Sequence, residues 1–441
     1  MNCRQPAHTR SLRHSPQGYS LIELLIGFTV AIILLMVLFQ TFQANTQLAR
    51  TQIDVADMQQ SQRVIQHEMV RVIRMVGRGG LAHMVDLGNG NRYLPALNVQ
   101  DNVAANQTIG SGTTPVIEEG TDVLTVRGVI NTPVYQLNFA DPTILTLLDA
   151  TNTPTTNASL AISGQIVISD PSPTGIPQDL TPLCDADDSS AAMVVVSPID
   201  ESIYAVVEVG DVTCGANQAT IDFAVSGGTY TDQYRTLYNS GTGANPILPS
   251  GLTNAAYAGL VEEYRYYVRE PEPDTTPAPT LSVARMFPGT DVAHLDNNTN
   301  LTLDLADNIM DLQIALGYDS SLGAAPSDQN GDGFTNEDDI VVTETVDGRD
   351  DDWLFNSDQD DPNAAPFIPP WDNDPGSGTP FKPALYYVRL STLARVHVPD
   401  RTYDSLQIEA IENRDVDPLN SLDERRYRRQ LMQTTIDLRN L

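Results

Sequence analysis

Residues 18–30 read GYSLIELLIGFTV, and they open the apolar run that decides the fold of this chain. The run extends from Leu21 to Phe39, 19 residues in which Glu23 is the one charged side chain and Thr29 the one hydroxyl. At about 1.5 Å of rise per residue, a helix of this length crosses about 30 Å of hydrocarbon. The sequence therefore predicts a transmembrane helix over residues 19–39.

The segment before the run, residues 1–18, carries Arg4, Arg10 and Arg13 and no acidic residue. It has the charge of the n-region of a signal peptide but no apolar h-region of its own. Basic residues beside a transmembrane helix remain on the cytoplasmic side. We therefore expect this segment in the cytoplasm and the rest of the chain exported across the membrane.

A basic leader that ends in glycine, followed by an aromatic residue and by Glu23, resembles the class III signal of type IV prepilins. The residues that carry the resemblance are Gly18, Tyr19, Leu21, Ile22, Glu23, Leu24 and Leu25. The resemblance implies that a prepilin peptidase in the membrane cleaves between Gly18 and Tyr19 and N-methylates the new terminus. Phenylalanine is the usual first residue in that family, and Tyr19 keeps the aromatic ring.

Glu23 needs a physical explanation, because a carboxylate in a membrane helix is costly. At the bilayer centre the cost is about 2.5–3.5 kcal/mol on insertion scales, it falls toward the interface, and such side chains are usually paired. In an assembling filament the partner would be the α-amino group of a neighbouring subunit, which would set the register of otherwise apolar helices. The alternative is a plain signal anchor that tolerates an interfacial glutamate.

The helix is expected to continue beyond Phe39, because no proline occurs between Pro16 and Pro95. Residues 40–80 become polar on one side and keep an apolar stripe on the other, formed by Leu48, Val55, Ile65, Met69, Ile73 and Val76. The last four follow helical spacing, and the sequence GRGG at 77–80 predicts the end of the helix. We expect residues 40–80 to be an amphipathic half-helix packed on a head at 81–441.

The head has the sequence pattern of a β protein. β-branched and aromatic runs separated by turn residues predict strands at Asp122–Val129, Gly164–Ser169, Ala192–Ser197, Tyr204–Val209, Ala384–Leu390 and Gln433–Leu441. Asn308–Asp319 fits either a strand or a short helix, and we favour the strand.

Three head segments resemble the PilW group of type IV pilus assembly proteins. They are GTDVLTVRG (Gly120–Gly128), ADNIMDLQIALGYD (Ala306–Asp319) and LRN (Leu438–Asn440). The resemblance implies an α+β, pilin-like fold, in which a long N-terminal helix, transmembrane and then amphipathic, packs on a large, elaborated antiparallel β head.

The sequence DQNGDGFTNEDD, residues 328–339, has the spacing of a 12-residue calcium loop. Gly333 stands at the sharp turn, and the ligands would be Asp328, Asn330, Asp332, the carbonyl of Phe334, Asn336 and Asp339. Aspartate at the last position is closer to a dockerin-type loop than to an EF-hand. The three carboxylates would repel one another without a cation, so we predict bound Ca²⁺; the alternative is an acidic, solvated turn.

Two cysteines follow the membrane segment, Cys184 and Cys214, and neither belongs to a metal-binding pattern. If the head is exported we expect them to form a disulfide, and the alternative is two unrelated buried thiols.

Four arginines in DERRYRRQ, residues 423–430, indicate either ion pairs with local acids or docking to an acidic neighbouring pilin.

Composition excludes some classes of function. The chain of 441 residues has 25 Lys and Arg against 57 Asp and Glu, a net charge of −32, which argues against nucleic-acid partners and suits cation binding. No nucleophile elbow, phosphate-binding loop, dinucleotide fingerprint or zincin motif is present, so we do not expect an enzyme.

Together these features predict a minor pilin that helps to start or cap a type IV pilus, with a role in adhesion or twitching motility. Its expected partners are the prepilin peptidase, the inner membrane, other minor and major pilins and a tip adhesin. It would reside in the inner membrane with its head in the periplasm, and then at the cell surface. The alternatives are a type II secretion pseudopilin of the J type and an uncleaved membrane-anchored adhesin.

Overall fold

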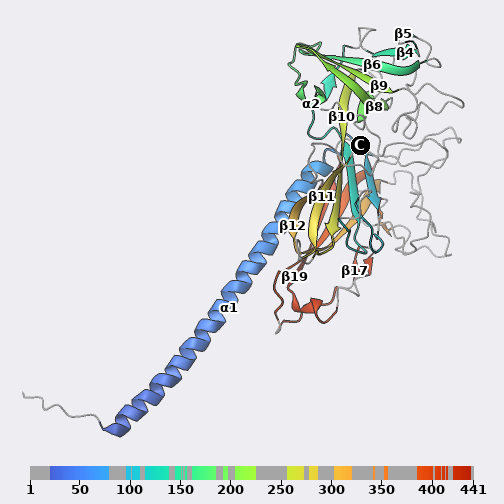
Figure 1. Cartoon of the computed structure of the whole chain (residues 1–441). Helices are drawn as coiled ribbons and strands as arrows, with labels where there is room; N and C mark the ends of the chain where they lie inside the picture. Colours follow the sequence, from blue (N-terminus) through green and yellow to red (C-terminus); the bar gives the residue numbers. More distant parts are fainter. Residues whose placement is uncertain are drawn as a thin grey trace, which may run out of the picture. The chain divides into compact units, whose positions relative to one another are not determined.

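The structure is a computed structural model of the chain, and its sheets and helices are drawn in Figure 1. It describes residues 20–78, 96–100, 102–109, 115–138, 145–149, 151, 154–155, 161–184, 192–196, 204–224, 256–272, 278–286, 302–319, 341–342, 352–355, 385–400, 403–408, 410–412, 414–415 and 421–438. The chain divides into two compact units, Met1–Ala56 and Asp57–Leu441.

One long helix, α1 (Leu21–Ile73), dominates the N-terminal part of the chain and contains 53 residues. It ends in a turn over 74–78, in which Gly77 has a positive φ of 70°. The predicted stop at 77–80 therefore begins within this turn, just after the last helical residue. A left-handed glycine is a common way to end a helix, because glycine adopts that conformation without a steric penalty.

The last turns of α1 belong to the second unit, and one face of them is buried there. Ile65, Met69, Ile73 and Val76 are all buried, which confirms the lower part of the predicted apolar stripe. Leu48, which the pattern placed on the same stripe, is exposed, so that part of the prediction is wrong. The sequence pattern did not predict contacts of Gln62 and Gln66 with the head. Gln62 Nε2 donates to the carbonyl of Gln430 at 2.9 Å, and Gln66 Nε2 donates to Thr434 Oγ1 at 3.0 Å.

The second unit is built mainly of antiparallel β-structure. Its strands are β1 (Leu97–Gln100), β2 (Val123–Gly128), β3 (Tyr135–Gln136), β4 (Leu145–Asp149), β5 (Pro154–Thr155), β6 (Ala161–Ser169), β7 (Ala192–Val196), β8 (Tyr204–Cys214), β9 (Gln218–Ala224), β10 (Tyr257–Arg269), β11 (Thr280–Met286), β12 (Thr302–Asp307), β13 (Ile309–Asp319), β14 (Val341–Val342), β15 (Asp352–Phe355), β16 (Leu385–Arg395), β17 (Ala410–Ile411), β18 (Arg414–Asp415) and β19 (Arg429–Asp437). Two short helices accompany them, α2 (Thr181–Cys184) and the 3-10 helix η5 (Glu424–Arg426).

Three sheets are formed by the described residues. Twelve strands make the largest, in the order β1-β2-β10-β7-β8-β9-β6-β4-β5, with β11 and β3 also paired to β10 and β12 paired to β11. A five-stranded sheet has the order β14-β15-β13-β16-β19, and β17 and β18 form a small hairpin. The fold class is α+β, as predicted: one long apolar N-terminal helix and a large antiparallel sheet.

Strand β10 links two parts of the large sheet (Figure 1). Its first half, Tyr257–Val261, pairs with β7, whereas its second half, beginning at Glu262, pairs with β2 and continues beside β11. The strands β3 and β6 to β9 precede β10 in the chain and share one apolar core, to which Tyr135, Ile166, Val207 and Phe223 contribute. The sequence pattern did not predict β10.

The predicted strands correspond to β2, β6, β7, β8, β16 and β19, with end points that differ by up to five residues. The choice of a strand for Asn308–Asp319 is confirmed by β13. The largest differences are in β8 and β16, which each extend five residues beyond the predicted C-terminal end.

Candidate functional site

Glu23 lies in the first turn of α1, where it forms a reciprocal pair with Ser20. The Ser20 N–H donates to Glu23 Oε2 at 3.0 Å, and the Glu23 N–H donates to Ser20 Oγ at 3.3 Å. This arrangement is a capping box, which satisfies backbone N–H groups that the start of a helix leaves unpaired.

Gly18 and Tyr19, the residues of the expected cleavage, lie outside the described residues. Sequence reasoning assigned Glu23 a partner in another subunit and missed Ser20. The signal was nevertheless in the sequence, because Ser-x-x-Glu directly before an apolar run is the signature of a capping box. Of the two carboxylate oxygens of Glu23, Oε2 takes part in this box.

The apolar part of α1 is long and apolar enough to cross a membrane, and none of its most apolar window is buried. Its hydroxyl groups are satisfied within the helix: Thr29 Oγ1 donates to the carbonyl of Ile26 and Thr41 Oγ1 to that of Val37, each at 2.8 Å. Backbone and side-chain polar groups must be paired internally in lipid. This segment is a candidate membrane anchor or signal sequence.

The segment Gly120–Gly128 connects α1 with both large sheets. At its first end, the Asp122 N–H donates to the carbonyl of Leu312 in β13 at 2.9 Å, and Asp122 Oδ2 accepts from the Ile314 N–H at 2.7 Å. Gln313 Nε2 donates to the carbonyl of Gly120 at 3.0 Å. The side chains of Asp122 and Gln313 are buried, so these contacts join β2 to β13 through the core.

At its other end the same segment meets the C-terminal turn of α1. The Gly77 N–H donates to the carbonyl of Arg127 at 3.1 Å, and the Val129 N–H donates to that of Arg78 at 2.8 Å. A Cβ on Gly128 would lie 2.9 Å from the carbonyl oxygen of Met75, which leaves room only for glycine. Two of the segments that carried the PilW resemblance, Gly120–Gly128 and Ala306–Asp319, are thus in direct contact.

Two adjacent buried carboxylates, Glu262 and Glu263, mark the point where β10 passes between the two parts of its sheet. Glu263 forms ion pairs with Arg127 of β2 and with Arg265. The distance from Arg265 Nε to Glu263 Oε1 is 2.6 Å. Because neighbouring strand residues face opposite sides of a sheet, Glu262 lies on the other face. There its Oε1 accepts the backbone N–H groups of Asn131 at 2.7 Å and Thr132 at 2.9 Å.

The hydroxyl of Tyr264 donates to Glu262 Oε2 at 2.9 Å. Burial, with the nearby Glu262 carboxylate as a smaller cause, raises the pKa of Tyr264. The phenol is therefore a neutral donor at physiological pH. These ion pairs and hydrogen bonds attach the segment that follows β2 to strand β10. No sequence motif predicted them.

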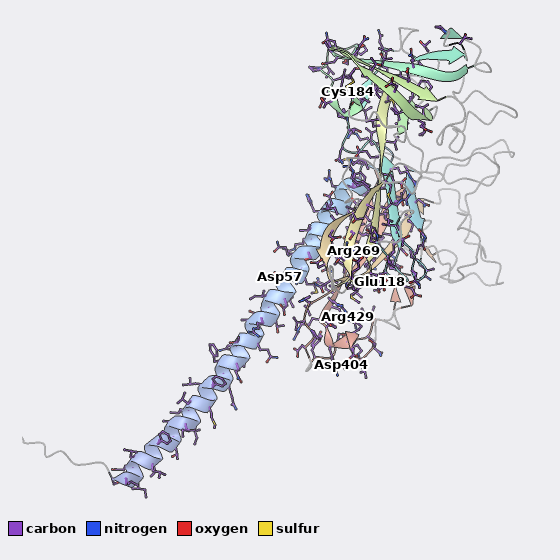
Figure 2. All side chains as sticks on the ribbon, in the orientation of Figure 1. Asp57, Glu118, Cys184, Arg269, Asp404 and Arg429 are labelled. Atoms are coloured by element: carbon purple, nitrogen blue, oxygen red, sulfur yellow. A yellow bond between two sulfur atoms is a disulfide. The ribbon has the colours of Figure 1, made fainter. Side chains whose placement is uncertain are left out.

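The expected disulfide is present between Cys184 of α2 and Cys214 at the end of β8, with 6.0 Å between the Cα atoms. Figure 2 labels Cys184 in the part of the head that contains α2 and β8. Closing a loop of this length contributes about 3–4 kcal/mol in the chain-entropy model. The disulfide fixes a short helix to the sheet beside the core that Leu183 shares with Val209.

The predicted calcium loop, Asp328–Asp339 with its ligands Asp328, Asn330, Asp332, Phe334, Asn336 and Asp339, lies outside the described residues. Within the part of the chain that the structure describes, no group of three or more His, Cys, Asp or Glu side chains is placed to hold a metal ion. Calcium binding therefore stays a prediction from sequence.

Three arginines of Asp423–Gln430, namely Arg425, Arg426 and Arg428, form ion pairs with local acids, as one of the expectations for this segment had it. Arg425 lies 2.7 Å from Asp404, Arg426 lies 3.1 Å from Asp423, and Arg428 lies 3.7 Å from Asp400. Figure 2 labels Asp404 and Arg429 in this region. Burial lowers the pKa of Arg429, whose guanidinium donates to Ser405 Oγ at 2.7 Å.

No protein-family model, curated protein or solved structure matches this chain.

Proposed function

We propose that this chain is a minor pilin of the type IV pilus, made as a prepilin, cleaved after Gly18 and N-methylated on Tyr19. It would be inserted in the inner membrane, meet other minor and major pilins there, and display its β head outside the membrane near the pilus tip. The chain would take part in filament assembly and would carry out no catalysis itself.

The observation that supports this proposal most is the construction of α1. Its first turn carries the Glu23 carboxylate of the capping box, the following turns as far as Phe39 are apolar and exposed, and one face of its last turns is buried in the β unit. A helix built in this way suits a subunit that is held in lipid by one half and joined to a folded head by the other. The capping box leaves a charge on Glu23, which would attract the α-amino group of a neighbouring subunit.

Two substitutions separate the cap from the charge. Glu23→Gln keeps an oxygen that accepts the Ser20 N–H, so the capping box survives, but it has no charge to pair with an amine. Glu23→Ala removes both. We expect both variants to insert into the membrane as well as the wild type, because loss of a charge eases insertion. We expect both to be depleted from sheared pili.

The matched control is Ser20→Ala, which removes one half of the box and keeps the carboxylate. It should enter pili at close to the wild-type level. Quantifying each variant in membranes and in sheared filaments provides the measurement. Glu23→Gln at wild-type levels in pili would mean that Glu23 serves only as a helix cap, and the charge-pairing part of the proposal would then fail.

A type II secretion pseudopilin of the J type and an uncleaved membrane-anchored adhesin remain the competing functions. The size of the head, with its twelve-stranded sheet, favours a rare position at the tip over repeated stacking in a shaft or a pseudopilus. Detection of the protein in purified pili separates a pilin from a pseudopilin, and the mature N-terminus separates either from the adhesin. Ca²⁺ at Asp328–Asp339 would order its own part of the head.

A further inference from the structure

The chain enters one part of the head once and leaves it once. We define this part, the described residues of 135–261, as the inserted lobe; it holds β3 to β9, α2 and the first half of β10. Every residue of its apolar core lies between Tyr135 and Leu260 in the sequence. The Cys184–Cys214 disulfide lies within it as well. The inserted lobe therefore has strands, a core and a covalent cross-link of its own.

Strand β10 changes its neighbours on both sides where it leaves the inserted lobe. Up to Val261 it pairs with β7, and its first residues, Tyr257 and Ala258, also pair with β3. From Glu262 it pairs with β2, and from Glu263 with β11. None of these four neighbours pairs with β10 on both sides of this point, so among the described strands β10 alone joins the two parts of the sheet. A single strand resists bending poorly, because the hydrogen bonds that stiffen a sheet run between strands.

The second connection is the irregular segment 129–134, which leads from β2 into β3. Glu262 holds this segment to β10. Its Oε1 accepts the N–H groups of Asn131 at 2.7 Å and Thr132 at 2.9 Å, and its Oε2 accepts from Asn131 Nδ2 at 3.2 Å. Thr132 Oγ1 lies 3.2 Å from Glu262 Oε1 and from the carbonyl oxygen of Leu260. One carboxylate thus ties together the two segments that connect the inserted lobe to the rest of the head.

Glu262 is buried, with 4% of its side chain exposed. A buried carboxylate is costly unless hydrogen bonds and opposite charges surround it. Besides the donors of segment 129–134, the Tyr264 hydroxyl donates to it at 2.9 Å, and Arg285 of β11 lies 3.5 Å away. The next residue, Glu263, is buried as completely, but it pairs with arginines of β2 and of β10 that lie outside the inserted lobe. The two carboxylates are matched in charge and burial, and they hold different partners.

We propose that the inserted lobe is a hinged body whose orientation on the rest of the head is set by Glu262. With the carboxylate in place, β10 and segment 129–134 act as one ribbon, and the lobe keeps one orientation. Without it, the irregular segment is released, and a single strand is left to bend and twist at Val261. Hinges absorb motion in a few residues and leave the packed bodies on either side intact. The proposal does not depend on the chain being a pilin.

Spin labels on either side of the hinge measure this orientation. The full chain in lipid nanodiscs carries Cys3→Ser, with labels at Ile176→Cys in the inserted lobe and Leu303→Cys in β12, both exposed positions. Double electron–electron resonance gives the distribution of distances between the labels. We expect one narrow distribution in this parent chain, a broader and shifted one with Glu262→Ala, and the parent distribution with the matched control Glu263→Ala. A broad distribution in the parent chain, no change with Glu262→Ala, or equal broadening in the two variants would overturn the proposal.

Hydrogen exchange separates a loosened hinge from an unfolded lobe. In Glu262→Ala the amides of Asn131 and Thr132 should exchange several-fold faster, because they lose their acceptor. The amides of β6 and β9 should keep the parent rates, because these strands belong to the core of the inserted lobe.

Thr132→Val is a milder variant, which removes one donor to Glu262 and keeps the branched shape of the side chain. It should shift the distance distribution in the same direction as Glu262→Ala, by less. If β6 and β9 lose their protection in Glu262→Ala, the milder variant decides the question. An unchanged distance distribution in Thr132→Val would then overturn the proposal.

Discussion

Replacing Asp122 by alanine is expected to weaken the attachment of β2 to β13. The carboxylate accepts the Ile314 N–H at 2.7 Å and the Asn102 N–H at 3.2 Å, and the residue is fully buried. A hydrogen bond to a charged group contributes about 1.5–3 kcal/mol to stability, so loss of both lowers the free energy of unfolding by about 3–6 kcal/mol. That is a large part of the 5–15 kcal/mol by which proteins are usually stable.

Asp122→Asn tests the same contacts with less change of shape. It keeps one carbonyl oxygen for the Ile314 N–H but turns an amide N–H₂ toward the Asn102 N–H, so we expect roughly half of the loss. The matched control is Asp307→Ala in β12, an exposed carboxylate that accepts the Thr280 hydroxyl at 3.1 Å. An exposed substitution of this kind changes stability by about 0.5 kcal/mol or less.

The assay is urea unfolding of the unit Asp57–Leu441, followed by circular dichroism of the β-structure. This unit keeps the buried turns of α1, which a fragment that begins at residue 81 would lose. Hydrogen exchange gives the local readout, because the Ile314 amide should exchange faster in Asp122→Ala. A loss below about 1 kcal/mol with unchanged exchange at Ile314 would refute the reasoning.

Two further predictions concern the head. Gly128→Ala should lower the free energy of unfolding by about 1–3 kcal/mol, because its Cβ would lie 2.9 Å from the Met75 carbonyl oxygen. The control is Gly215→Ala, where the nearest atom would be 3.4 Å from the new Cβ, and it should be near neutral. Equal losses of stability in the two variants would contradict the steric argument. Millimolar Ca²⁺ should raise the melting temperature of Asp57–Leu441 over EDTA, and Mg²⁺ should do so poorly. Asp328→Ala with Asp332→Ala should abolish that rise, and an unchanged rise would place the calcium site elsewhere.

The sequence was sufficient for features that depend on neighbours along the chain. Apolar content and the lack of proline predicted one long helix, and β-branched runs predicted β2, β7 and β13. The Cys184–Cys214 pairing was also predicted, since these were the two cysteines left after the membrane segment. The helix and the strands follow from residues that are close together in the sequence, and two cysteines can form only one pair.

Strand β10 was missed because its centre, Glu262, Glu263 and Arg265, contains charges that normally mark a solvent-exposed segment. Glu263 is buried because Arg127, 136 residues away, lies directly opposite in β2, and Glu262 is buried on the other face against the N–H groups of Asn131 and Thr132. The start of helix burial was misjudged for a related reason. Leu48 fits the period of the apolar stripe, yet it is exposed. The period shows which face of a helix is apolar, but it does not show where along the helix the folded head begins to cover that face.

In the proposed function, Glu23 lies in the first helical turn of a mature chain whose first residue is Tyr19. N-terminal mass spectrometry of the protein isolated from membranes tests it most directly, in a strain with active prepilin peptidase. The account predicts a peptide that begins at N-methylated Tyr19, and retention of the leader when Gly18→Ala brings a Cβ into the peptidase site. An intact leader in the wild-type chain, with Gly18 still joined to Tyr19, would contradict it.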